Sequence, residues 1–179
     1  AASIRIFSEY LPANWSVTNS YFGEGFEVFG WQKAHASVKN GVREISNNYF
    51  KDFSRNSAFI TDFTGGTQYH LVTDEYNVIA KFNNNVIVDC IANGGYAVRF
   101  YPASFDEIEI KDNYFISTQN TFAYPISIET VTYSRPEDDY SDKVTFTGNR
   151  IIGYSAYALE TAGTKSLHNV TDNYYAYYT

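Results

Sequence analysis

The sequence has no methionine, a single cysteine and only three histidines among its 179 residues. One thiol, Cys90, excludes a disulfide framework, and the apolar run around it predicts a small core residue. The histidines, His35, His70 and His168, are scattered, and their spacing matches neither a metal site nor a Ser–His–Asp arrangement. With a start at Ala1, the absence of methionine leads us to expect a segment of a longer chain.

Positive charge and long apolar runs are also scarce. Lys and Arg number 13 against 20 Asp and Glu, and the net charge of −7 argues against a nucleic-acid partner. Neither a signal peptide nor an apolar run long enough to cross a bilayer is present, so we expect no membrane insertion. Helical periodicity is not sustained anywhere, whereas 17 Tyr and 14 Phe favour strands. These features predict one all-β domain over residues 1–179.

A five-residue stretch recurs along the chain, centred on a small polar pair. Its copies are residues 18–22, 46–50, 83–87, 111–115, 147–151 and 171–175. An apolar residue precedes each copy, and polar residues stand on either side of it. This alternation is typical of a strand with one buried face, so each copy predicts two short strands joined by a turn. Repeats of this kind indicate a repetitive architecture.

Aligned columns of the repeat predict which residues stack from one copy to the next. The inward column before the turn contains Val17, Ile45, Phe82, Ile110, Phe146 and Val170, and the one after it contains Phe22, Phe50, Ile87, Phe115, Ile151 and Tyr175. The second turn position contains Ser20, Asn48, Asn85, Asn113, Asn149 and Asn173. Stacked amides both donate and accept hydrogen bonds, so we expect these asparagines to hold the fold and not to form a site.

These motifs resemble the right-handed parallel β-helix of the pectate-lyase-like superfamily, which includes polysaccharide lyases, pectin hydrolases and phage tailspikes. The resemblance covers nearly the whole chain and implies about six coils of three short strands each, with an asparagine ladder. It does not extend to the catalytic motifs of that superfamily. The helix that usually covers the N-terminal coil is also absent, so a homotrimer or an adjoining domain is expected to cover the coil ends.

Further strands are predicted at residues 3–7 and 25–29, and the middle strands of the later coils at 57–61, 97–101, 126–129 and 157–160. Together they predict an outward surface suited to a sugar polymer. One outward column contains Phe7, Phe29, Thr61, Tyr101, Glu129 and Glu160, and the other contains Arg5, Glu27, Phe59, Arg99, Ser127 and Ala158. Adjacent coils lie roughly 4.8 Å apart, which would put Glu129 directly beside Glu160. Aromatic rings can cover pyranose faces, and charged groups can bind hydroxyls or uronate carboxylates.

The predicted site follows from this surface. Two neighbouring carboxylates repel, so the pKa of one should rise, giving an acid and a base as in retaining glycoside hydrolysis. A lyase would use Arg99 or Tyr101 as the proton acceptor instead. The candidate catalytic residues are therefore Glu129, Glu160, Arg99 and Tyr101, unless both glutamates are solvated strand residues. The candidate substrate-binding residues are Phe29, Trp31, Phe59, Thr61, Asp62, His70 and Arg135.

Two further features are weaker signals. The loop containing Glu137, Asp138 and Asp139 has the oxygen ligands that Ca²⁺ prefers, although such a run is usually a solvated loop; no other cofactor or metal is expected. A second outward column contains Tyr21, Tyr49, Tyr114 and Tyr174, with Val86 and Arg150 between them. This column predicts a packing or assembly surface, or a second sugar platform.

The sequence therefore predicts a polysaccharide-recognising protein that acts as a polysaccharide lyase or retaining glycoside hydrolase, such as a tailspike segment. A non-catalytic glycan-binding or structural fibre segment is the alternative. Either function implies a secreted, extracellular or virion-surface location.

Overall fold

In the computed structural model, the described residues are 14–23, 40–52, 54–55, 77–92, 96–100, 107–119, 124–129, 144–162 and 169–177. All regular elements within these ranges are strands. Every strand pair between them is parallel. The all-β class predicted from the aromatic and alternating sequence is confirmed for this part of the chain.

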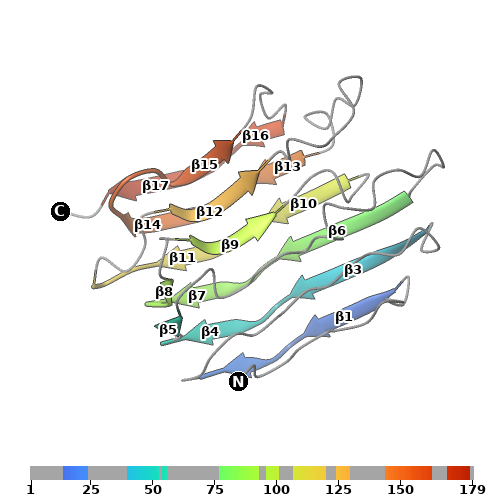
Figure 1. Cartoon of the computed structure of the whole chain (residues 1–179), viewed down its shortest axis with the longest axis horizontal. Coiled ribbons are helices and arrows are strands. Elements are labelled where there is room, and N and C mark those ends of the chain that lie inside the picture. Colours follow the sequence, from blue (N-terminus) through green and yellow to red (C-terminus); the bar gives the residue numbers. More distant parts are fainter. Residues whose placement is uncertain are drawn as a thin grey trace.

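Sheet A contains the strands that precede the repeated turn. They are β1 (Trp15–Thr18), β3 (Asn40–Ser46), β6 (Asn77–Asn83), β10 (Glu107–Lys111), β13 (Val144–Thr147) and β16 (Asn169–Thr171), and they pair in that order. Sheet order therefore follows chain order, with one strand from each repeat (Figure 1).

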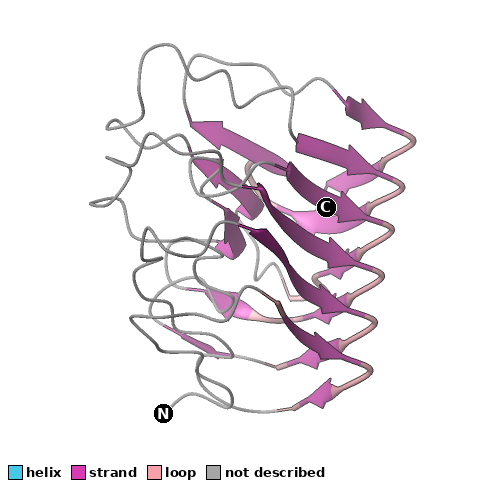
Figure 2. Cartoon of the chain, turned by 90° about the vertical axis from the view of Figure 1, so that its right-hand side faces the viewer, coloured by secondary structure: helices cyan, strands magenta, loops and turns pink. Residues whose placement is uncertain are grey.

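Sheet B contains the strands that follow the same turns. They are β2 (Tyr21–Phe22), β4 (Tyr49–Lys51), β7 (Val86–Val88), β11 (Tyr114–Ile116), β14 (Arg150–Tyr154) and β17 (Tyr174–Tyr177), again paired in chain order. Figure 2 shows the turns between the two sheets stacked along one edge.

Two smaller sheets complete the described structure. Sheet C pairs β9 (Tyr96–Phe100), β12 (Tyr124–Glu129) and β15 (Leu159–Ala162), with β12 in the centre. Sheet D pairs β5 (Ser54–Arg55) with β8 (Ile91–Ala92). The strands predicted at residues 3–7, 25–29 and 57–61 lie outside the described residues.

The strand registers confirm the predicted columns on both sides of the turn. Val17 pairs with Ile45, and the same row continues through Phe82, Ile110 and Phe146 to Val170. After the turn, the row from Phe22 to Tyr175 is in register as predicted. The Asn-containing pair marks the turn in every repeat, so the alignment of residues gives the alignment of strands.

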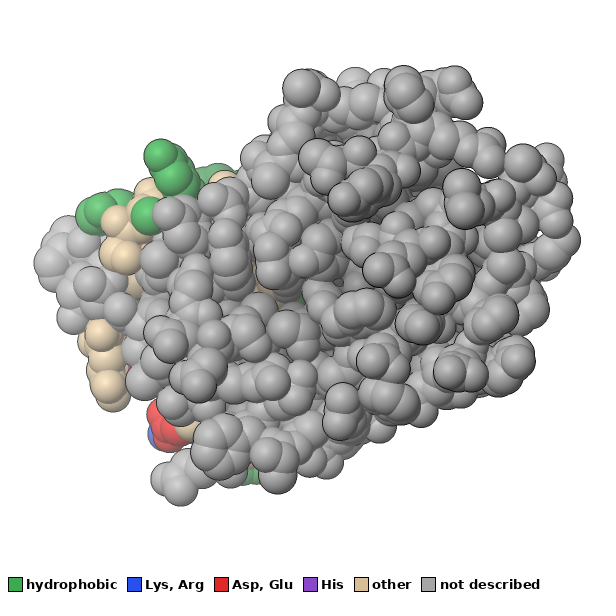
Figure 3. Space-filling model, in the orientation of Figure 1, with side chains coloured by type: hydrophobic (Ala, Val, Ile, Leu, Met, Phe, Trp, Pro, Cys, Tyr) green, Lys and Arg blue, Asp and Glu red, His purple; other side chains and the backbone are tan. Residues whose placement is uncertain are grey.

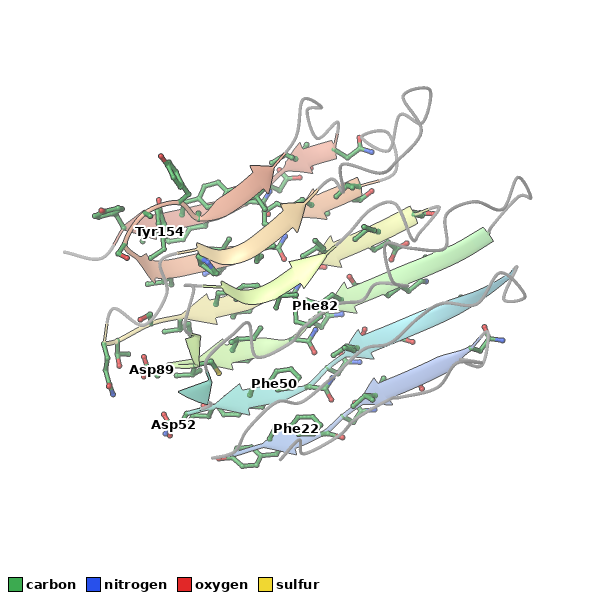
Figure 4. All side chains as sticks on the ribbon, viewed as in Figure 1. Phe22, Phe50, Asp52, Phe82, Asp89 and Tyr154 are labelled. Atoms are coloured by element: carbon green, nitrogen blue, oxygen red, sulfur yellow. The ribbon has the colours of Figure 1, made fainter. Side chains whose placement is uncertain are left out.

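The hydrophobic core consists of the inward columns. Ile45, Phe50, Phe82, Phe115 and Phe146 are completely buried. The rings of Phe22 and Phe50 stack with centroids 5.0 Å apart, and Figure 4 shows Phe22, Phe50 and Phe82 along the stack. Each such side chain stabilises the fold by about 1.5–3 kcal/mol through removal of apolar surface from water.

The buried asparagines form hydrogen bonds in series. The Nδ2 of Asn48 donates to Oδ1 of Asn85, and equivalent bonds run from Asn85 to Asn113, Asn113 to Asn149 and Asn149 to Asn173, at 2.9–3.2 Å. Each acceptor Oδ1 also takes the backbone N–H of the preceding asparagine. Ser20 begins the series by donating its N–H to Asn48. These bonds satisfy the side-chain amides of the buried asparagines.

Candidate functional site

Only part of the predicted site lies within the described residues. Arg99, Glu129 and Glu160 lie on β9, β12 and β15, where the structure defines the strand register. Tyr101 and the acidic loop at 137–139 lie outside the described residues. So do all the predicted substrate-binding residues: Phe29, Trp31, Phe59, Thr61, Asp62, His70 and Arg135.

The register of sheet C corrects the predicted pairing of the two glutamates. Glu160 pairs with Ser127 and not with Glu129, whose partner is Ala162. Ser127 also pairs with Arg99 on the other side. The two glutamate positions are therefore diagonal, about 8 Å apart between Cα atoms from the strand spacing and the rise of two residues. The prediction that Glu129 and Glu160 stand side by side, as the two carboxylates of a retaining hydrolase do, is therefore wrong.

The wrong register has a local cause in the sequence. Tyr157 and Leu159 are apolar and stand two residues apart, a pattern that predicts a strand beginning at Tyr157. In the structure β15 begins at Leu159, and Tyr157 is 62% exposed. No polar turn pair precedes this strand to fix its start, unlike the strands of sheets A and B. Alternation alone cannot distinguish registers that differ by two residues.

Sheet C nevertheless brings three chemically useful positions into one row. Val98 and Ile126 are buried and in register, and Leu159 packs against the same core. Arg99, Ser127 and Glu160 each directly follow one of these residues and are in register with one another across the three strands. The sequence columns place Ser127 beside Arg99, as the structure does, but they do not single it out as a site residue because they pair it with Ala158 instead of Glu160.

The outward tyrosine row on sheet B has the predicted register. Tyr21, Tyr49, Val86, Tyr114, Arg150 and Tyr174 pair in that order. The rings of Tyr21 and Tyr49 stack at 5.5 Å with an angle of 10° between their planes. The guanidinium of Arg150 lies 5.5 Å from the centroid of Tyr114. Side chains within the row thus cover each other's ring faces.

The outer face of sheet A carries a small network of opposite charges. Glu109 accepts from Lys111 at 3.4 Å and lies 3.9 Å from Lys81. The amide of Asn83 donates to Glu109 at 3.2 Å, and its Oδ1 accepts the backbone N–H of Lys111. Such partly exposed pairs contribute little to stability, and the face has the character of a solvated surface.

A second turn contains a buried carboxylate that sequence reasoning did not single out. Asp89, which follows β7, is 8% exposed and has a φ of 48°. Its two oxygens accept the N–H of Thr118 at 2.6 Å and the hydroxyl of Thr118 at 2.7 Å. Figure 4 shows Asp89 and Asp52 one strand apart at this second bend. These hydrogen bonds join one repeat to the next, so Asp89 has a structural role.

The pKa of one tyrosine, Tyr175 on β17, is shifted. Partial burial raises the pKa of the Tyr175 hydroxyl above its usual value of 10.0, and the nearby Tyr154 adds to the increase. Tyr175 lies on β17, the end strand of sheet B, so this effect concerns the edge of that sheet.

Metal ligands do not gather among the described residues, where no group of three or more His, Cys, Asp or Glu is placed to hold an ion. Within the same residues, no helix is long and apolar enough to cross a membrane. The fold and geometry define an all-β protein of in-register parallel strands. Comparison with models of known families, with curated proteins and with solved structures finds no match to this chain.

Proposed function

We propose that the chain is a right-handed parallel β-helix of about six coils with an asparagine ladder, like those of the pectate-lyase-like superfamily. In-order pairing of one strand per repeat in both sheet A and sheet B supports this proposal. So do the serial hydrogen bonds of the asparagines. Such a fold presents long rows of side chains parallel to its axis, a shape that suits an extended polymer.

The protein's function under this proposal is to bind a polysaccharide along the outward face of sheet C. The observation that carries it is the row formed by Arg99, Ser127 and Glu160 across three adjacent strands. A guanidinium binds carboxylates through paired hydrogen bonds, while a hydroxyl and a carboxylate bind sugar hydroxyls. Because a cation is included, an anionic polysaccharide is the preferred ligand. The proposal implies an extracellular, secreted or virion-surface protein.

The other described faces are less suited to a sugar chain. On sheet B the rings of Tyr21 and Tyr49 stack on one another, and Arg150 lies over Tyr114, so part of the aromatic surface that a pyranose would use is already covered. On sheet A the charged groups of Lys81, Glu109 and Lys111 already pair with one another. Sheet C therefore remains the preferred surface.

Cleavage of the bound polysaccharide is a second candidate function. Glu129 and Glu160 occupy the same face of sheet C at diagonal positions, and Arg99 shares the row of Glu160. Inverting hydrolases hold their two carboxyls far enough apart to leave room for a water, and the diagonal positions of Glu129 and Glu160 suit such a spacing better than directly paired positions would. A lyase that uses Arg99 or Tyr101 as the base is the eliminative version of this proposal.

Affinity electrophoresis against a panel of anionic and neutral polysaccharides tests binding. We expect the wild type to bind an anionic polymer and Arg99→Ala to weaken that binding by about tenfold or more, since a charge-assisted contact is lost. Arg150→Ala removes the same charge from sheet B and should retain wild-type affinity. Failure of every polymer to bind, or equal affinity of both variants, would contradict the proposal.

Product assays on the same panel test cleavage. Reducing ends report hydrolysis, and ultraviolet absorbance reports the double bond formed by a lyase. If the protein cleaves, Glu129→Gln and Glu160→Gln should each lower the rate by about 100-fold or more, whereas Glu44→Gln on sheet A should not. Binding without product from the wild type would leave the non-catalytic function and remove the enzymatic one.

A further inference from the structure

Three exposed asparagines at the first turn position have the sequence context in which asparagine is chemically unstable. Each is followed by a short polar residue, and the pairs are Asn19–Ser20, Asn47–Asn48 and Asn84–Asn85. Asparagine is thermolabile because the backbone nitrogen of the following residue can attack its side chain, and a short following residue hinders that attack least. The turns lie along the right-hand edge in Figure 2, the side turned away from the viewer in Figure 3.

The reaction that such a pair undergoes is deamidation. The backbone nitrogen of the second residue loses its proton and forms a bond to Cγ of the asparagine. The Cγ–Nδ2 bond breaks, and Nδ2 takes up a proton and leaves as ammonia. Water then opens the resulting succinimide ring to give aspartate or isoaspartate. Aspartate fits the turn, since Asp112 occupies the same position, but isoaspartate lengthens the main chain and would disturb the strand register that follows.

The structure holds each of the three attacking nitrogens in a hydrogen bond to the next repeat. The N–H of Ser20 donates to Oδ1 of Asn48 at 3.0 Å. The N–H of Asn48 donates to Oδ1 of Asn85 at 3.1 Å, and the N–H of Asn85 donates to Oδ1 of Asn113 at 2.9 Å; both of these bonds are buried. An amide oxygen is too weak a base to remove the proton, so each nitrogen must leave its bond and meet water before it can react.

We propose that the hydrogen-bonded asparagines from Asn48 to Asn173, here called the asparagine series, protect the first-position asparagines from deamidation. The protection is local, because each Oδ1 holds one attacking nitrogen of the preceding repeat. Asn48 thus protects Asn19, Asn85 protects Asn47, and Asn113 protects Asn84. This role is chemical and is separate from the contribution of the same bonds to folding stability.

Peptide mapping by mass spectrometry after incubation in mildly alkaline buffer tests the proposal. In the folded wild type, Asn19, Asn47 and Asn84 should deamidate at least about tenfold more slowly than in the same chain unfolded in urea, because the nitrogen must first lose its hydrogen bond. Asn113→Ala should accelerate Asn84 by about tenfold and leave Asn19 and Asn47 at their wild-type rates. In Asn85→Ala the accelerated site should be Asn47 instead.

Asn113→Asp is the matched control. It loses the same donated bonds to the Phe82 carbonyl and to Asn149 as Asn113→Ala does, but it keeps an oxygen that accepts the N–H of Asn85. Asn84 should therefore deamidate at the wild-type rate in this variant, whereas a general loss of stability would accelerate Asn84 in both variants. Circular dichroism establishes that each variant is folded, and the same pair of substitutions at Asn48, read at Asn19, serves if an Asn113 variant is not.

Three outcomes would overturn the proposal. The first is deamidation of the folded wild type at the rates measured in urea. The second is equal acceleration of Asn84 by the alanine and aspartate substitutions. The third is a folded alanine variant in which all three asparagines, or none of them, react faster.

Discussion

The most constrained residues in this chain are the asparagines at the second turn position. Asn113 is completely buried and uses both ends of its amide. Its Oδ1 accepts from the backbone and the side chain of Asn85 at 2.9 and 3.1 Å. Its Nδ2 donates to the carbonyl of Phe82 and to Asn149 at 2.8 and 2.9 Å. No other side chain of this size offers two acceptor sites and two donors at this spacing.

Replacement of Asn113 by alanine should therefore be costly. Asn113→Ala removes the Oδ1 acceptor of the buried Asn85 N–H and also breaks the bonds to Phe82 and Asn149, and a buried group left unsatisfied costs about 1–3 kcal/mol. We expect a loss of about 3–5 kcal/mol in the free energy of unfolding, measured by urea denaturation.

The matched control is Asn84→Gly, one repeat earlier at the first turn position. Asn84 is exposed and has a φ of 56°, which glycine adopts without strain. Asn84→Gly should change the free energy of unfolding by less than about 1 kcal/mol. If Asn113→Ala proved as mild as this control, the serial hydrogen bonds would not hold the repeats together.

Tyr175 provides a pH test at the same scale. Burial, followed by the effect of Tyr154, raises its pKa in the folded state above the usual 10.0. The folded protein therefore holds this proton more tightly than the unfolded chain, and the corresponding stability is present below pH 10 and lost as the pH rises through the folded pKa. Tyr175→Phe should lessen the alkaline decrease in unfolding free energy. Identical pH profiles for both proteins would contradict this assignment.

At the scale of elements, the backbone conformation of the turns explains why different residues can occupy the same position of the repeat. The first turn position has a φ between 53° and 67° in all six described copies. It is occupied by Asn19, Asn47, Asn84, Asp112, Gly148 and Asp172. Asn, Asp and Gly are the residues that adopt this left-handed conformation most readily. The small polar pair seen in the sequence is thus a backbone requirement at its first position and a hydrogen-bonding requirement at its second.

Gly153 is required by the β-bulge of β14. Its φ is 84°, and a Cβ atom there would lie 2.1 Å from the carbonyl oxygen of Ser117. Gly153→Ala should therefore lower the free energy of unfolding by about 1–3 kcal/mol or more, since the opposing atom is backbone and cannot rotate away.

Gly148→Asn is the comparison for Gly153→Ala in thermal unfolding. Its Cβ would press on Oδ1 and Cγ of the Asp112 side chain, which can rotate away, and would be in ordinary contact with the backbone nitrogen of Asp112; Asn or Asp stands at this position in the other repeats. We expect a change below about 1 kcal/mol. Equal destabilisation by the two variants would mean that the bulge does not impose the requirement on Gly153.

The sequence predicts sheets A and B well and sheet C poorly, for one physical reason. In sheets A and B, every strand begins or ends at an Asn-containing turn, so Val17, Ile45 and Phe82 are aligned by their distance from it. Before β15 there is no such turn, and Tyr157 resembles a strand residue although it is exposed. Of the candidate site, the pairing of Arg99 with Ser127 could be predicted, but the pairing of Glu160 with Ser127 could not.

At the scale of the whole molecule, the account depends on repeats that are stacked in chain order. Distances across the stack should then depend on the number of intervening strands alone. Ser16, Glu44, Lys81, Glu109, Thr145 and Asn169 form one outward row of sheet A. Polysaccharide binding along sheet C requires the same regular spacing, because the row of Arg99, Ser127 and Glu160 is built by the same coils.

Pulsed electron paramagnetic resonance between spin labels on this row is the most direct test. In a Cys90→Ala background, labels would be placed in pairs at Ser16 with Glu109, Ser16 with Thr145, and Ser16 with Asn169. The account predicts narrow distributions whose centres increase by equal steps of about 4.8 Å, from roughly 14 Å for the first pair. Distances that do not increase in strand order would contradict the stacking of parallel strands in chain order and, with it, the proposed sugar-binding row.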